Sequence, residues 1–111
     1  MRPMLAMLVL FLVACGNPAQ DQRAKEAAYI RDETDALRGR LKDPQSAEIS
    51  GAFVSRKAGP PVVCGYVNSK NSFGGFTGKQ RFVSASAADT IVTEEDMADG
   101  EMDSLWSKVC R

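Results

Sequence analysis

The sequence predicts one small α+β domain in which an N-terminal helix, a three- to four-stranded antiparallel sheet and a C-terminal helix follow one another. Three observations support this prediction: apolar residues with helical spacing early in the chain, β-branched segments in the middle, and a second group of spaced apolar residues near the end. With 111 residues, the chain has room for a single domain.

The first predicted helix covers Gln20–Lys42, where apolar and threonine side chains recur at the i, i+4, i+7 and i+11 positions of one helix face. We expect it to end near Asp43, because Pro44 disfavours helical geometry in the residue before it. Its polar face carries charges of both signs, so we interpret the apolar stripe as packing on the domain and not on a membrane surface. The stripe consists of Ile30, Thr34, Leu37 and Leu41.

The middle of the chain predicts three strands and an optional fourth. Val62–Asn68 is the best of them, because it is rich in valine and contains a tyrosine. A turn rich in glycine and proline precedes it, and a long glycine-rich connection, Ser69–Gly78, follows it. The other segments are Ala47–Ser55, Lys79–Ala85 and, as the optional strand, Thr90–Thr93.

The final predicted helix extends from Glu94 towards the C-terminus. The acidic residues at Glu94–Asp96 suit a helix start, where they complement the helix dipole, and Gly100 weakens the middle of the helix. The apolar positions that predict it are Met97, Met102, Leu105, Trp106 and Val109.

Charge is balanced overall but unevenly distributed. The chain has 14 basic and 14 acidic residues, a balance that favours no nucleic-acid partner. Every charge between Ile49 and Ala88 is basic, whereas Asp89–Asp103 holds seven acidic residues and no basic one. We interpret these segments as two solvated faces that attract each other within the molecule.

The N-terminus has the organisation of an export signal. Met4–Ala14 is an unbroken apolar run of 11 residues behind the basic residue Arg2. A helix of this length spans about 16 Å, roughly half of a bilayer's hydrocarbon core, so it is too short to cross a membrane. We therefore predict a signal at residues 1–14, a linker at residues 15–22 and the folded domain at residues 23–111.

The four residues Leu12-Val13-Ala14-Cys15 resemble the lipobox of bacterial lipoproteins, with a branched apolar residue three before the cysteine and a small one directly before it. The resemblance implies that diacylglycerol is attached to Cys15 and that the signal is cut before it, which makes the lipid-bearing membrane a partner. In a Gram-negative bacterium, Gly16 in place of an aspartate implies the periplasmic side of the outer membrane. An ordinary secretory signal is the alternative.

If Cys15 carries lipid, the other two cysteines can pair only with each other. Export to an oxidising compartment then favours a Cys64–Cys110 disulfide, which closes 47 residues counted inclusively. A metal site is the alternative, but a chain with no histidine and two remaining thiols lacks the usual zinc ligands. We therefore expect no metal and no cofactor.

The residue types present favour a non-catalytic protein. The absence of histidine removes the commonest general base, so we predict no catalytic residues and no enzymatic activity. The alternative is a small cell-wall-active enzyme, or an inhibitor of one, that uses the acidic residues. These residues are Glu94, Glu95, Asp96, Asp99, Glu101 and Asp103.

The connection from Lys70 to Phe76 is the candidate binding loop. Its glycines allow a partner to approach the backbone closely, and its phenylalanines offer apolar anchors beside a basic side chain. An envelope protein or an anionic glycan would suit such a surface. The alternative, which we favour from the sequence, is that both rings fold inward and cap a small core. The residues concerned are Lys70, Asn71, Phe73, Gly74, Gly75 and Phe76.

The segments Lys42–Ala47, Val63–Asn68 and Lys70–Phe76 resemble a group of small exported proteobacterial proteins with no known activity. The resemblance covers Lys42–Phe82, about half of the predicted mature chain. It implies that the turn, the cysteine-bearing strand and the glycine-rich loop form one structural unit. Taken together, the sequence predicts a lipid-anchored envelope protein with a binding or structural role in the periplasm.

Overall fold

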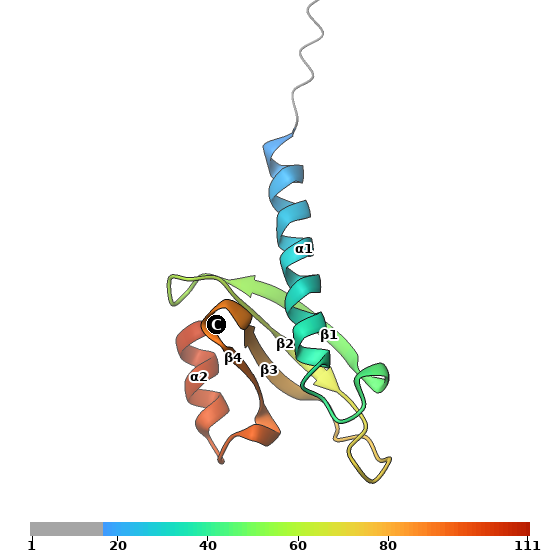
Figure 1. Ribbon diagram of the computed structural model, residues 1–111. Coiled ribbons are helices and arrows are strands. Elements are labelled where there is room, and N and C mark those ends of the chain that lie inside the picture. The colour runs from blue at the N-terminus through green and yellow to red at the C-terminus, as the bar shows by residue number, and fades with distance from the viewer. Residues whose placement is uncertain (1–16) are drawn as a thin grey trace, which may run out of the picture.

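The structure is a computed structural model that describes residues 17–111. The predicted signal at residues 1–14 and the predicted lipidation site Cys15 lie outside the described residues. The sheet is an antiparallel meander with the strand order β1-β2-β3-β4 (Figure 1). The predicted α+β class, with a helix before the sheet and a helix after it, is confirmed. The elements are α1 (Pro18–Arg38), β1 (Glu48–Ser55), β2 (Val62–Asn68), β3 (Gln80–Ala85), β4 (Thr90–Thr93) and α2 (Glu101–Val109).

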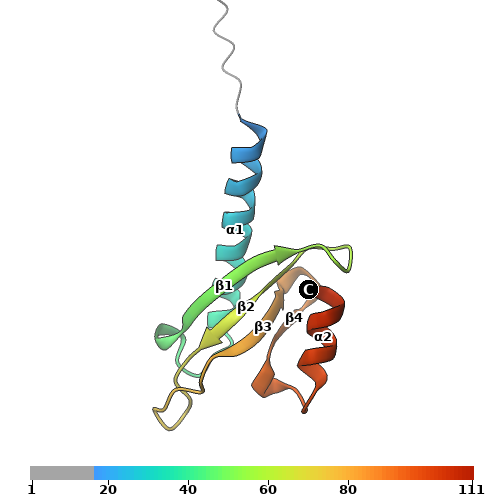
Figure 2. The same cartoon turned by 180° about the vertical axis from the view of Figure 1, so that it is seen from behind.

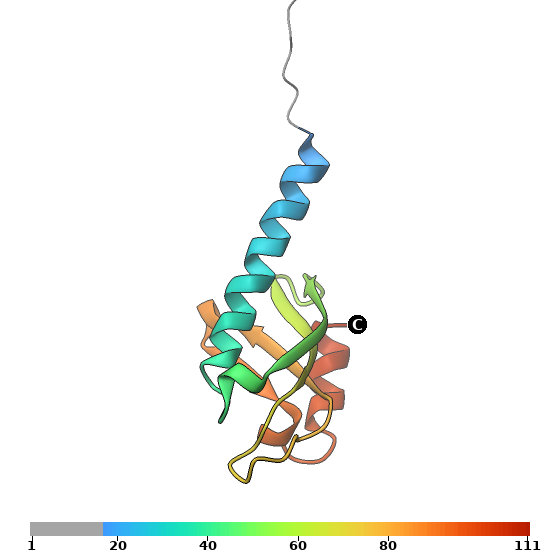
Figure 3. The same cartoon turned by 90° about the vertical axis from the view of Figure 1, so that its right-hand side faces the viewer.

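The two helices cover opposite faces of the sheet, so the domain has three layers (Figures 2 and 3). Successive side chains of a strand point to opposite faces. On β2, Val63 and Val67 therefore pack with Leu37 of α1, whereas Cys64 packs with Met102 of α2. Burial on both faces explains why β2 has an almost continuous apolar sequence where a half-exposed strand would alternate.

The predicted disulfide between Cys64 and Cys110 is confirmed, with an S–S distance of 2.05 Å. It joins β2 to the end of α2, a helix of nine residues that is too short to be stable alone. Two side chains of the first hairpin also contact the C-terminal carbonyls of α2. The Ser55 hydroxyl donates to the Val109 carbonyl at 2.5 Å, and the Lys57 ammonium donates to the Ser107 carbonyl.

The helix α1 begins earlier than predicted. The Asn17 side chain accepts a hydrogen bond from the Ala19 amide at 3.1 Å, and Pro18 occupies the first helical position. The predicted linker at residues 15–22 is therefore helical from Pro18 onward. The pair Asn17-Pro18, which lies within the predicted linker, serves as the helix start.

Two other helix boundaries also differ from the prediction. Gly39 caps α1, which therefore ends at Arg38 and not near Asp43. The last helix is divided in two by an extended Met97, with a φ of −116° and a ψ of 154°, and by Gly100, whose φ of 82° is a left-handed conformation that other residues rarely adopt. The acidic segment Glu94–Asp96 consequently forms a separate 3₁₀ turn before α2 begins.

The N-terminal part of α1 extends beyond the sheet (Figures 1 and 3). Every residue from Pro18 to Lys25 is exposed. Contact with the domain begins where Glu26 pairs with Arg56 at 3.1 Å and where the Tyr29 hydroxyl donates to the carbonyl of Pro61 at 3.0 Å. Within residues 17–111, we find no helix with the length and apolarity needed to span a bilayer.

A buried carboxylate attaches the packed part of α1 to the end of β3. Glu33 is 3% exposed and accepts hydrogen bonds from the Ser84 hydroxyl at 2.8 Å, the Ser86 hydroxyl at 2.6 Å and the Ser86 amide at 3.0 Å. Burial raises the pKa of Glu33, but the hydrogen bonds from Ser86 and Ser84 together outweigh burial, so the pKa is lower than usual. The carboxylate is therefore ionised and fully paired at neutral pH.

The basic and acidic segments meet at one residue. Arg81 of β3 contacts Glu94 at 2.8 Å and Asp103 of α2 at 2.6 Å, and its guanidinium carbon lies 5.7 Å from the centre of the Trp106 ring. Hydrogen bonds to Glu94 and Asp103 raise the pKa of Arg81. At this point the predicted attraction within the molecule is confirmed.

Replacing both bridged cysteines with alanine is expected to lower the free energy of unfolding by up to about 4 kcal/mol, because the chain between them loses its covalent closure. Urea unfolding of the double variant and of the wild-type protein measures the difference. Reduced wild-type protein is the control and should resemble the variant. An unchanged unfolding midpoint would mean that α2 is held without the bond.

Replacing Glu33 with glutamine should cost about 1–3 kcal/mol of stability at neutral pH, because three hydrogen bonds lose their charged acceptor. The folded pKa of Glu33 lies below its ordinary value, so the stabilisation is present above that value and is lost as the pH falls through the folded pKa. The difference in thermal unfolding midpoint between wild type and variant should therefore disappear in acid. A difference that stays constant with pH would contradict this assignment.

Candidate functional site

The connection between β2 and β3 is an ordered loop, and we call residues 70–76 the aromatic loop. The side-chain oxygen of Asn71 accepts hydrogen bonds from the Phe73 amide at 2.9 Å and from the Gly75 amide at 3.2 Å. The Asn71 amide in turn donates to the Gly75 carbonyl at 2.8 Å, and Gly74 completes the turn with a φ of 81°. One asparagine thus holds the backbone of the tip.

The base of the aromatic loop is attached to the rest of the domain. The hydroxyl of Ser46 accepts from the Lys70 amide at 2.8 Å, which joins the loop to the 3₁₀ turn Pro44–Ser46. On the returning side, the Gly78 amide donates to the side chain of Asn68 at 3.1 Å. Both ends of the loop therefore have fixed positions relative to the sheet.

Both aromatic rings of the loop face solvent. Phe73 is 96% exposed and Phe76 is 49% exposed, with the Lys70 ammonium 5.7 Å from the centre of the Phe76 ring. The favoured interpretation that these rings fold inward to cap the core is therefore wrong. The hydrogen bonds of Asn71 close the loop on itself beyond the end of the sheet, so its tip is kept away from the core. An exposed phenylalanine is an anchor whose burial contributes about 1.5–3 kcal/mol.

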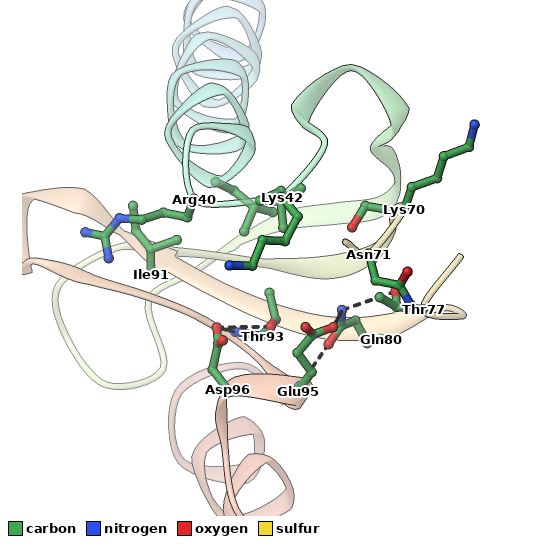
Figure 4. A pocket seen from close by; sticks show the side chains of 13 residues that line it. Arg40, Lys42, Lys70, Asn71, Thr77, Gln80, Ile91, Thr93, Glu95 and Asp96 are labelled. Carbon is green, nitrogen blue, oxygen red and sulfur yellow. Dashed lines mark hydrogen bonds between the residues drawn. The ribbon is translucent and has the colours of Figure 1, made fainter. Parts of the chain in front are cut away.

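A pocket of about 80 Å³ adjoins the base of the aromatic loop (Figure 4). Its walls come from the end of α1 and the chain after it, the start and end of the β2–β3 connection, and the paired strands β3 and β4 with the turn that follows them. The volume exceeds the roughly 10–15 Å³ that one water molecule needs. The polar residues that matter chemically are Lys42, Asn71, Gln80, Thr93, Glu95 and Asp96.

The acidic side of this pocket is held by hydrogen bonds. Gln80 donates to one oxygen of Glu95 at 3.2 Å and accepts from the Glu95 amide at 2.9 Å. The amide and hydroxyl of Thr93 both donate to one oxygen of Asp96 at 3.1 Å. Gln80 and Thr93 are buried whereas Glu95 and Asp96 are exposed, so a buried side chain holds one oxygen of each carboxylate while the acidic residue itself faces solvent. Within the described part of the chain, the second oxygen of each carboxylate accepts no hydrogen bond.

Lys42 supplies the opposite charge. Its side chain points across the pocket in Figure 4, whereas Lys70 points away from it. Lys42 makes no ion pair within residues 17–111. Of the three basic residues that line the pocket, Arg40 pairs with Asp89 at 3.4 Å and Lys70 points away, so Lys42 is the cation that faces the two carboxylates.

The acidic residues of the alternative, catalytic prediction do not lie together at one site. Glu94 and Asp103 pair with Arg81, and hydrogen bonds from the Arg81 side chain and backbone lower the pKa of Glu94, which keeps it ionised at neutral pH. A general acid needs the reverse shift. Asp99 and Glu101 are exposed. Among the described residues, no group of three or more acidic or thiol side chains is placed to hold a metal ion.

A second hollow lies at the opposite end of the sheet, beside the hairpin between β1 and β2. It measures about 600 Å³, and its wall is almost entirely apolar. Such a surface offers contact area but few groups that set a ligand's orientation. Residues that line it include Pro60, Pro61, Val62, Val83, Leu105 and Val109.

Replacing Asn71 with alanine is expected to loosen the aromatic loop without unfolding the domain. The amides of Phe73 and Gly75 lose their acceptor, so their hydrogen exchange should speed up by about tenfold. Exchange followed by NMR measures this, with the Val67 amide of β2 as an internal reference. Ser72→Ala is the control, and equal exchange in both variants would contradict the role of Asn71.

The sequence predicts the aromatic loop but not the pocket beside it. In the sequence, Glu95 and Asp96 are members of an acidic segment, and Lys42 is the end of a predicted helix. No local pattern links them, because they lie more than 50 residues apart and meet only in the folded chain. Comparison of the chain with protein-family models, curated proteins and solved structures finds no match in any of the three.

Proposed function

We propose that this protein is a non-catalytic binding domain, held at the periplasmic face of the cell envelope by a lipid on Cys15, and that its aromatic loop binds an envelope protein. The main support for this proposal is that Phe73 is 96% exposed to solvent. Aromatic side chains, phenylalanine among them, are enriched in protein interfaces relative to the rest of the protein surface. The partner is expected to offer an apolar pocket that takes this ring.

The order of the loop supports the same function. A flexible loop loses conformational freedom when it binds, and this loss reduces affinity. In the aromatic loop, Asn71 already holds the tip, and Ser46 and Asn68 already hold the base. The ring of Phe73 can therefore enter a partner without further ordering of the backbone.

The direction of α1 is consistent with a membrane anchor at the N-terminus. Figures 1 and 3 show α1 leaving the domain at the end opposite to the aromatic loop. The exposed residues Pro18–Lys25 add about 12 Å of helix between the domain and the residues before it. With a lipid on Cys15, the loop would face away from the anchoring membrane and towards proteins of the periplasm.

Site-specific crosslinking in cells tests the loop. A photoreactive residue at position 72 or 76 should give one common adduct, and the Phe73→Ala variant should lose it. The same residue at position 108, an exposed site on α2, is the control and should give no such adduct. The absence of an adduct from both loop positions, or an adduct that survives loss of Phe73, would refute the proposal. An adduct that resists protease would identify a glycan and not a protein.

The anchor needs its own experiment. Metabolic labelling with palmitate should label the wild-type protein, and Cys15→Ser should abolish the label because it removes the thiol that accepts the lipid. Cys64→Ala/Cys110→Ala is the control that keeps Cys15 and should keep the label. An unlabelled wild-type protein would leave the loop as a binding site on a secreted domain and would contradict the lipid anchor.

A further inference from the structure

We propose that the pocket beside the aromatic loop binds a free amino acid or an amino-acid end group that carries an ammonium and a carboxylate on the same carbon. Lys42 would hold the carboxylate, and Glu95 and Asp96 would hold the ammonium. This is a second binding site, and it goes beyond the binding of a protein by Phe73.

The arrangement of charge selects a ligand with both signs. The Lys42 ammonium points into the pocket from one side, and the two carboxylates lie on the other (Figure 4). A simple anion would gain contact with Lys42 but would be repelled by two carboxylates. A simple cation would be repelled by Lys42. Only a ligand that carries both charges is attracted by both sides of the pocket.

The hydrogen-bonding capacity of the pocket agrees with this choice. Gln80 and Thr93 occupy one oxygen each of Glu95 and Asp96. The remaining oxygens can accept two of the three hydrogen bonds that a ligand ammonium donates. Lys42 can donate up to three hydrogen bonds to a ligand carboxylate. Each charged group of the ligand therefore meets a complementary group that the described domain does not use.

Size and lining restrict the ligand further. A volume of about 80 Å³ admits a handful of non-hydrogen atoms. Leu37, Leu41 and Ile91 add an apolar part to the wall, which suits a small aliphatic side chain. Alanine is therefore a suitable probe, as the smallest amino acid with an apolar side chain. A contact of this size is expected to bind with a dissociation constant of about a millimolar.

NMR titration of the full chain in detergent micelles provides the test. Alanine should shift the amide signals of Gln80, Thr93 and Glu95 in a saturable way. Propionate and ethylamine, which each carry one of the two charges, should bind at least about tenfold more weakly. Equal binding of propionate would make the pocket a simple anion site and would overturn the proposal, as would the absence of saturation at concentrations about tenfold above a millimolar.

Two substitutions locate the site. Lys42→Met and Glu95→Gln should each weaken alanine binding at least about tenfold, because each removes one ionic partner while keeping the shape of the side chain. Lys25→Met and Glu48→Gln remove the same charges at exposed positions outside the pocket and should leave binding unchanged. Unchanged thermal midpoints show that the variants are folded. Equal affinity in all four variants would contradict the site.

A third substitution separates this site from the aromatic loop. Phe73 does not line the pocket, so Phe73→Ala should keep alanine binding while it abolishes the crosslink to the protein partner. Loss of the crosslink with alanine binding intact supports two sites. Loss of alanine binding in Phe73→Ala would show that the shifts come from the loop, and the pocket proposal would fail while the loop proposal stands.

Discussion

The rest of the structure depends on β2 being covered on both faces. Its side chains alternate between α1 and α2, and the Cys64–Cys110 disulfide makes the second contact covalent. A small domain gains little stability from its core alone, so a covalent bond between sheet and helix matters more here than in a larger protein. The aromatic loop starts just after the end of β2, so the position of this strand fixes the position of the loop's base.

Because the end of β2 is fixed, the loop can hold its shape while the Phe73 ring stays exposed. The loop satisfies its own backbone through Asn71, and hydrogen bonds to Ser46 and Asn68 hold its base. None of these contacts requires Phe73 to enter the core, which Leu37, Val67 and Phe82 already fill. The ring is consequently left for a partner, and the charged pocket beside it offers a different kind of contact to a much smaller ligand.

The sequence predicts features that depend on local residue types. The apolar run of β2 and the cysteine pair predict the centre of the fold, because a strand buried on both faces is apolar throughout and an oxidised pair needs two cysteines. Features that depend on a single torsion or on a distant contact are not predictable in this way. The extended Met97 and the left-handed Gly100 divide the last helix, and the direction of Phe73 depends on the hydrogen bonds of Asn71. Lys42 and Glu95 line the same pocket, and only folding brings them close together.

The aromatic loop is ordered and presents Phe73 to solvent before any partner binds. NMR relaxation of the backbone amides from Lys70 to Phe76 tests this most directly. We expect order parameters of about 0.85, as in rigid backbone, and no nuclear Overhauser contacts from the Phe73 ring to Leu37 or Phe82. Order parameters below about 0.6, or contacts between the ring and these core residues, would contradict it.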